Sequence, residues 1–233
     1  MIDTVFAASA LAETHRDLVR NIVSLRVSED LFDDLSDERT AWQVAIELEL
    51  TTKPTPFKSI APAIDRPFEE ALWNDAIGYP FTHWMQSRYS DGRFGVWYGA
   101  DTLETSIHET AYHWRAGLLA DAGFLRPGVS IDRKIYEVRC DAALVDLRPA
   151  VPAFPSLIDP ADYHLTQQIG ARLHHEGHPG LVTRSARCAG DVYAVLNAKV
   201  LKQARQVGYL SYTTTDRGVQ VERGSGRVWK VLL

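Results

Sequence analysis

The sequence predicts an α+β protein in which helices flank a central, mostly antiparallel sheet, preceded by an all-helical extension. In the first 80 residues apolar side chains recur at helical spacing, whereas from about residue 93 a period of two becomes common. Short strand candidates joined by tight turns dominate the last third of the chain, a pattern typical of antiparallel pairing. We therefore expect a helical N-terminal extension over residues 1–80 and a sheet-forming domain over residues 81–233.

The extension is predicted from apolar stripes separated by loops that contain proline. One stripe runs through Leu18, Ile22 and Leu25. A second stripe runs through Trp42, Ile46 and Leu50, and the prolines that follow residue 51 end its helix. The segment Asp65-Arg66-Pro67 resembles a cap with proline at the first helical position, which predicts a short third helix.

A strand followed directly by a helix opens the second domain. Phe94, Val96 and Tyr98 share one face of the predicted strand. Asp101 and Glu104 resemble a capping box, which marks a helix start. The apolar stripe of this helix, which ends near Gly123, contains Ile107, Ala111, Trp114 and Leu118.

The remaining elements are mostly short strands around one more helix. That helix starts at Asp159-Pro160 and stops at Gly177, and its apolar residues are Leu165, Ile169 and Leu173. The predicted strands are Ile135–Cys140, Ala143–Leu147, Gly180–Thr183, Val192–Leu196, Tyr209–Tyr212 and a final pair around Gly224-Ser225-Gly226.

Composition sets the broad class of the protein. The 233 residues are 45% hydrophobic, so the chain can bury a core and is not disordered. Cys140 and Cys188 are too few for a disulfide framework, which favours a cytoplasmic location. No apolar run approaches the roughly 18 residues of a membrane span, and the N-terminus lacks the basic region of a secretion signal. We therefore expect no membrane association.

The charge distribution argues against binding of nucleic acid. The net charge is −5, and the first 80 residues contain 7 Lys and Arg against 15 Asp and Glu. The remaining residues contain 18 against 15, without the clustered Lys and Arg of a nucleic-acid surface. The mildly basic second part suits a small anion instead.

Histidine spacing argues against a metal site. His108-Glu109 with His113 resembles a zinc motif, but five residues along a helix rotate the side chains by about 140°, so the two rings diverge. His174, His175 and His178 form a second group, which Gly177 interrupts by ending the helix. We expect no metal, and a metal-dependent hydrolase built on these histidines is the weaker alternative.

Other common catalytic motifs are absent. Ser185 lacks the flanking glycines of a hydrolase nucleophile elbow, and no phosphate-binding Gly-x-x-x-x-Gly-Lys loop occurs. Gly92, Gly95 and Gly99 precede or lie within a strand, whereas a dinucleotide fingerprint follows one. What remains is an arginine and a tyrosine before the first helix of this domain, and Glu109 on it, about 200° from Ile107 around the axis.

Three blocks together resemble the RES domain, a family named for its arginine, glutamate and serine. The blocks are Arg88–Ala100 (RYSDGRFGVWYGA), Thr105–Thr110 (TSIHET) and Gly180–Arg187 (GLVTRSAR), in that order. The resemblance covers about residues 81–200, which makes residues 81–233 the RES catalytic domain, and the helical residues 1–80 resemble the extension of longer members. It implies a fold similar to ADP-ribosyltransferase toxins and NAD⁺ as substrate.

The resemblance also implies roles for single residues. Arg88 matches the family arginine, Arg93 is a second candidate because it follows Gly92 in the Gly-Arg-aromatic form, and the tyrosine, glutamate and serine match Tyr98, Glu109 and Ser185. The NAD⁺-binding candidates are Arg88, Arg93, Tyr98, Ser185 and Arg187.

The chemistry suits these residue types. An arginine binds pyrophosphate through charge-assisted hydrogen bonds, each contributing about 1.5–3 kcal/mol. Cleavage of the nicotinamide–ribose bond passes through an oxocarbenium-like state, which the Glu109 carboxylate would stabilise. Tyr98 would stack on nicotinamide or position the ribose, and Ser185 would donate a hydrogen bond to the nicotinamide or phosphate end.

The resemblance implies the toxin of a bacterial toxin–antitoxin pair. We expect it to cleave NAD⁺ and transfer ADP-ribose to a protein acceptor. Two alternatives remain open, namely an NAD⁺ glycohydrolase or phosphorylase that uses water or phosphate, and a non-catalytic nucleotide-binding module. The implied partner is an Xre-like helix-turn-helix antitoxin that covers the active site.

Overall fold

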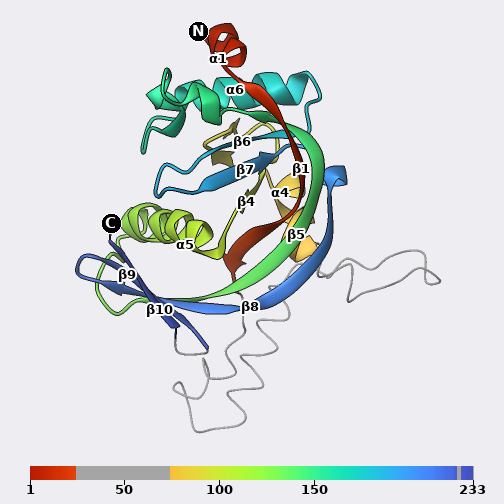
Figure 1. Ribbon diagram of the computed structural model, residues 1–233. Coiled ribbons are helices and arrows are strands. Elements are labelled where there is room, and N and C mark those ends of the chain that lie inside the picture. Colours follow the sequence, from red (N-terminus) through yellow and green to blue (C-terminus); the bar gives the residue numbers. More distant parts are fainter. Residues whose placement is uncertain (25–73, 225–226, 233) are drawn as a thin grey trace, which may run out of the picture. The chain divides into compact units, whose positions relative to one another are not determined.

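The computed structural model describes residues 1–24, 74–224 and 227–232 (Figure 1). Met1–Ser24 and Phe68–Leu233 form one compact unit. The helices predicted through Trp42, Ile46 and Leu50 and at Asp65-Arg66-Pro67 lie outside the described residues. No helix in the described part of the chain is long and apolar enough to cross a membrane.

The main sheet of the described residues has eight strands. Their order is β1 (Ala10–Val23), β4 (Trp97–Ala100), β7 (Asp191–Val195), β6 (Gly180–Arg184), β5 (Ser130–Asp146), β8 (Leu201–Thr215), β9 (Gly218–Arg223) and β10 (Arg227–Leu232). All neighbours are antiparallel except β5 and β6. Because β1 also pairs with β5, the strands β1, β4, β7, β6 and β5 form a closed ring. The predicted α+β class with a mostly antiparallel sheet is confirmed.

Helices flank the sheet, and a two-stranded hairpin precedes β4. The helices are α1 (Ile2–Ala7), α4 (Tyr79–Thr82), α5 (Leu103–Tyr112) and α6 (His164–His175), and the hairpin strands are β2 (Gln86–Ser87) and β3 (Ser90–Asp91). Figure 1 shows α6 beside α1 at one end and α5 near β9 and β10. Apolar clusters attach α6 to β5, β6 and β7, and α5 to β8 and β9. The sheet and α5 thus hold their side chains in fixed positions.

The helix predicted through Leu18 and Ile22 is wrong, because these residues lie in β1. This strand pairs with β5 from Ala10 opposite Asp146 to Val23 opposite Arg133. A spacing of four residues places side chains on one face of a strand as well as of a helix, so the stripe fitted both structures. The hydrogen bonds of the long ladder with β5 stabilise the strand rather than a helix. Residues 1–24 belong to the same compact unit as the sheet.

The helix after β4 ends near Gly123 as predicted, but its cap and its second half differ from the prediction. Its N-cap is Thr102, whose Oγ1 accepts a hydrogen bond from the Thr105 N–H at 3.1 Å, so the expected Asp101–Glu104 capping box is wrong. Beyond Tyr112 the helix continues as a π-helix, His113–Leu119. The wider turn shifts the apolar face by one residue, so Leu119 is buried where Leu118 was expected.

Two smaller predictions also change. The predicted strands Ile135–Cys140 and Ala143–Leu147 are parts of one continuous strand, β5. The second predicted helix, α6, begins at His164 rather than at Asp159. Residues Asp159–Tyr163, which were predicted to be the first turn of this helix, form a loop at the site described next.

Candidate active site

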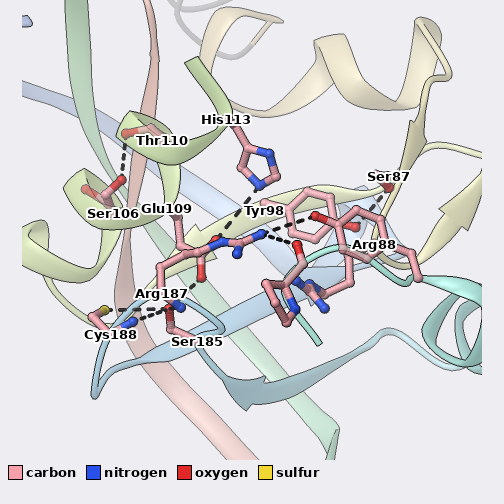
Figure 2. A network of polar contacts seen from close by, with 12 residues as sticks. Ser87, Arg88, Tyr98, Ser106, Glu109, Thr110, His113, Ser185, Arg187 and Cys188 are labelled. Atoms are coloured by element: carbon pink, nitrogen blue, oxygen red, sulfur yellow. Dashed lines mark hydrogen bonds and ion pairs between the residues drawn. The ribbon is translucent and has the colours of Figure 1, made fainter. Parts of the chain in front are cut away.

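A cavity of about 360 Å³ opens where β1 and β4 meet α5. Three of the predicted residues, Arg88, Tyr98 and Glu109, line this cavity. Ser185 lies directly behind Glu109 and contacts its carboxylate (Figure 2). Residues that are 76 positions apart in the sequence therefore meet in one site.

Glu109 is held in a defined orientation by Ser185. The Ser185 hydroxyl donates a hydrogen bond of 2.5 Å to Glu109 Oε1. Its oxygen accepts hydrogen bonds from the backbone N–H groups of Arg187 at 2.9 Å and Cys188 at 3.2 Å, so its hydrogen is directed at the carboxylate. The Glu109 side chain is 19% exposed and lines the cavity, and none of the hydrogen bonds between the described residues uses its second oxygen.

The loop that carries Ser185 docks on α5 through a glycine. The Ser185 N–H donates to the Gly190 carbonyl oxygen at 2.8 Å. A Cβ on Gly190 would lie 2.0 Å from Thr105 Oγ1, which is far inside van der Waals contact. Only glycine permits this close approach, and the approach brings the serine to Glu109.

Tyr98 forms a wall of the cavity with its hydroxyl already occupied. The hydroxyl accepts a hydrogen bond from the Tyr89 N–H at 3.0 Å and donates one to Ser87 Oγ at 2.9 Å. Burial raises the pKa of Tyr98 to about 12, so the side chain is neutral at physiological pH. Tyr98 can therefore contact a ligand through its ring, because its hydroxyl hydrogen is already bound to Ser87 of the hairpin.

Arg88 lies in the turn between β2 and β3 and reaches over the cavity. Its Nη1 donates to the Asp159 carbonyl oxygen at 2.8 Å, and its guanidinium lies 4.4 Å from the Tyr163 ring centroid. The turn is anchored on α6, where a Cβ on Gly170 would lie 1.9 Å from the Tyr89 carbonyl oxygen. Glycine at this position lets the helix support the turn.

The other candidate for the family arginine, Arg93, does not line the cavity. Its side chain is 80% exposed and forms an ion pair of 2.6 Å with Asp91. The geometry therefore favours Arg88 over Arg93 as the arginine of the site.

Arg187 extends from the loop after β6 toward the loop Asp159–Tyr163. Its Nη2 donates to the Pro160 carbonyl oxygen at 2.6 Å and lies 3.4 Å from the Tyr163 hydroxyl. Its guanidinium packs on Tyr112, 3.3 Å from the ring centroid, and its Nε is buried without a hydrogen-bond partner among the described residues. It borders the site near Ser185, as Figure 2 shows.

Sequence reasoning missed Arg20, which lines the same cavity from β1. Its Nη1 donates to the Tyr98 carbonyl oxygen at 2.8 Å, and its guanidinium lies 5.4 Å from the Trp97 ring centroid. Burial, reinforced by the nearby charge of Arg133, lowers the pKa of Arg20 to about 10, so it remains protonated. Reading Leu18, Arg20 and Ile22 with a strand period would have placed this arginine beside buried residues.

Positive charge dominates the cavity and its surroundings. In the described part of the chain, Arg20, Arg88, Arg133 and Arg187 form no ion pair with a carboxylate. Arg133 binds Asn21 instead, through Oδ1 at 2.5 Å and the backbone oxygen at 2.9 Å. Unpaired guanidinium groups around a single glutamate fit a ligand with more than one negative charge.

The histidines do not form a metal centre in the described residues. No group of three or more His, Cys, Asp or Glu side chains converges there. His113 lines the cavity with its Nε2 3.9 Å from Glu109 Oε2.

The RES domain family profile matches residues 64–215. The chain belongs to the RES-domain family. This confirms the resemblance drawn from the three sequence blocks. No curated protein sequence matches the chain. Among solved structures, a chain of the crystal structure of the M. tuberculosis MbcT–MbcA toxin–antitoxin complex aligns with 12% identity and a TM-score of 0.45, covering 88% of this RES protein and 91% of that chain.

Proposed function

We propose that this RES-domain protein is the toxin of a toxin–antitoxin pair that acts on NAD⁺ in the cytoplasm. In this proposal it cleaves the nicotinamide–ribose bond and transfers ADP-ribose to a protein acceptor. The observation that carries the proposal is the Glu109 carboxylate, oriented by Ser185 and surrounded by arginines that lack carboxylate partners. In such a site the arginines match the dianionic pyrophosphate of the substrate, and the carboxylate matches the positive charge of the transition state.

Each residue has a distinct part in this reaction. Arg88, from the turn between β2 and β3, and Arg20, from β1, bind the pyrophosphate, and Arg187 adds a third positive charge nearby. As the bond to nicotinamide breaks, positive charge develops on the ribose, and the Glu109 carboxylate stabilises it. Ser185 acts as a positioning residue because its hydroxyl hydrogen is bound to Glu109. Tyr98 supplies the ring against which the nicotinamide or ribose packs.

A surface beside the cavity supports a protein acceptor. Tyr79, Trp84 and Met85 are 56%, 58% and 72% exposed. Trp84 and Met85 directly precede Gln86, Ser87 and Arg88, which line the cavity, and Tyr79 begins the short helix α4 that comes before them. Exposed large apolar side chains can take part in protein binding, and these lie close in sequence to the residues that line the cavity.

The family resemblance supplies the proposed partner. We propose an Xre-like helix-turn-helix antitoxin that neutralises the protein by covering this cavity. The antitoxin, rather than the RES protein, would bind DNA, because the chain has net negative charge and no basic cluster typical of nucleic-acid binding.

The test is incubation with NAD⁺ labelled on its adenylate side, with and without cell lysate. We expect nicotinamide release together with label on a lysate protein. The Glu109→Gln variant should bind NAD⁺ but lose release by at least about 10²-fold, because the change keeps shape and removes charge. Glu104→Gln is the matched control, since Glu104 lies on the same helix, is exposed and does not line the cavity.

Other outcomes assign other functions. Nicotinamide release with only free ADP-ribose or its phosphorylated form would identify a glycohydrolase or phosphorylase. Binding of NAD⁺ without release under any condition would contradict catalysis and support the nucleotide-binding module.

A further inference from the structure

His113 occupies a special place on the helix that carries Glu109. It lies four residues after Glu109, where α5 ends at Tyr112 and the π-helix begins. Its Nε2 is 3.9 Å from Glu109 Oε2, and it lines the cavity. π-helical segments within α-helices are rare and occur frequently at functional sites.

His113 can offer a ring nitrogen to a ligand, because its one polar contact in the described part of the chain is the 3.9 Å approach of Nε2 to Glu109 Oε2. Among the described residues neither nitrogen forms a hydrogen bond, and the ring packs edge-on against Tyr112, with centroids 5.6 Å apart. The side chain is 59% exposed, so a second substrate can reach it. Tyr98 and Ser185 differ in this respect, because the hydrogens of both hydroxyls are bound to protein oxygens.

The charges around His113 come from four elements. Glu109 faces it from its own helix, Arg187 from the loop after β6, Arg88 from the turn between β2 and β3, and Arg133 from β5. Partial desolvation in the cavity lowers the pKa of His113 below its usual 6.5, the three arginines act in the same direction, and Glu109 opposes them. The imidazole is therefore neutral at pH 7 and free to accept a proton.

We propose that His113 is a catalytic residue, the general base that takes the proton from the ADP-ribose acceptor. This inference rests on the proposed NAD⁺ cleavage and names the acceptor class, a hydroxyl group of a protein or water. The bond between C1′ and nicotinamide breaks, and nicotinamide leaves with the bonding electrons. The acceptor oxygen bonds to C1′ while its proton passes to His113. Glu109, 3.9 Å away, stabilises the imidazolium until it releases that proton to solvent.

The test compares His113→Gln with wild type in nicotinamide release across pH 5 to 8, using the full chain. For wild type, the rate should fall as pH drops through the depressed pKa of His113, because the base becomes protonated. The variant should be slower by about 10²-fold at pH 7. It should also lose this acidic limb, with little change in the affinity for NAD⁺.

Sodium azide distinguishes a base from a merely structural histidine. Azide is already an anion, needs no deprotonation and is attracted by the cationic cavity, so it should restore release by His113→Gln but not by Glu109→Gln. His108→Gln is the control, since His108 adjoins Glu109 without lining the cavity and should retain the wild-type rate and pH profile.

Two results would overturn the inference separately. If wild type releases nicotinamide and His113→Gln keeps the same rate and the same acidic limb, His113 is not the base. The same holds if His113→Gln is slow and azide does not restore its rate. In both cases the proposed cleavage of NAD⁺ still stands. Absence of nicotinamide release by wild type at every pH overturns the proposed function and this role together.

Discussion

The cavity has two walls that are built differently. The sheet wall carries Arg20 on β1 and Tyr98 on β4, where ladder hydrogen bonds with neighbouring strands fix the backbone. The loop wall carries Arg88 in a short turn, and Ser185 and Arg187, in the loop after β6, lie next to the cavity without lining it. On the loop wall, position depends on a few hydrogen bonds and on glycines that allow close approach.

The difference predicts how each wall responds to a ligand. Arg88 and Arg187 donate to the carbonyl oxygens of Asp159 and Pro160, which are neutral acceptors. A phosphate oxygen forms a stronger, charge-assisted hydrogen bond, so a ligand can draw these two arginines away from the loop. Arg20 is held against Trp97 and the sheet, so it should stay in place. The sheet wall is preorganised and the loop wall adapts.

The largest effect on stability is expected in the sheet that carries this wall, at the ion-pair cluster of Arg148, in the variant Arg148→Met. Arg148 binds Asp146 through two hydrogen bonds, at 2.8 and 2.7 Å, and Asp191 at 2.6 Å. The side chains of Asp146 and Asp191 are each 12% exposed, so removal of the guanidinium leaves the mostly buried Asp146 carboxylate without its ion-pair partner and Asp191 with Arg184 alone. We expect a loss of about 3–5 kcal/mol in the free energy of unfolding, measured in urea. Arg184→Met, which removes a more exposed partner of Asp191, should cost less, and an equal loss would contradict this account.

The same cluster predicts a pH dependence. Burial alone would raise the pKa of Asp146, but hydrogen bonds and charge from Arg148 outweigh it and lower the pKa below 3.8. The stability that Asp146 contributes is therefore present above pH 3.8 and lost as pH falls through the depressed pKa. In Arg148→Met only the backbone N–H of residue 148 and the charge of Arg184 still oppose burial, so the acid loss of stability should move to higher pH. An unshifted acid limb in unfolding experiments would exclude this linkage.

A smaller effect is expected on the loop wall, in Gly190→Ala. The new Cβ collides with the Thr105 side chain and moves the loop that carries Ser185. We expect a loss of about 1–3 kcal/mol in stability and a fall in nicotinamide release, read from thermal unfolding and the labelled-NAD⁺ assay. Gly117→Ala is the matched control because nothing lies within 4 Å of its Cβ position. Normal release by Gly190→Ala would show that the close approach does not position the serine.

The two walls can be compared directly through their arginines. Arg20→Gln and Arg88→Gln should each weaken ADP-ribose binding by about 10- to 100-fold, the loss of one charge-assisted hydrogen bond, measured by calorimetry. Only Arg20→Gln should also lower the melting temperature, because Arg20 binds the Tyr98 carbonyl and packs on Trp97. Equal melting temperatures for the two variants would remove the distinction between the walls.

The smallest effect is expected for Arg93→Ala. Its exposed ion pair with Asp91 contributes at most about 1 kcal/mol, and its side chain does not line the cavity. NAD⁺ binding and nicotinamide release should match wild type. A large loss of binding would reassign the family arginine from Arg88 to Arg93.

The sequence predicted the elements with strong local signals and misjudged those that depend on distant pairing. Ile107 and Ala111 of α5 and Trp114 of the following π-helix are buried as predicted, because helical periodicity is a local property, whereas Leu118, the last residue of the predicted stripe, is exposed. The residues of β1 carry an ambiguous spacing, and only the ladder with β5 makes them a strand. Arg20 was missed for the same reason.

The site was predicted through its motifs rather than through its geometry. The three RES blocks identified Arg88, Tyr98, Glu109 and Ser185, and three of these line the cavity while the fourth binds Glu109. Spacing alone left Arg88 and Arg93 as alternatives, since the two lie five residues apart in the same segment. Their different surroundings, a cavity for one and solvent for the other, exist only in the folded chain.

By itself the sequence determined the α+β class, the family and the residue types available for chemistry, because periodicity, turns and motifs are encoded over short segments. The tertiary structure alone decided that β1 closes the ring of strands and that Arg20 joins the site. It also decided that Ser185 orients Glu109 and that the helix face with Glu109 and His113, which lie four residues apart, turns toward the cavity. Most of these contacts join segments far apart in the chain, and that of His113 depends on which way its helix faces. Sequence spacing specifies neither the contacts between distant segments nor the direction in which a helix faces. The packing of sheet, helix and loop determines both.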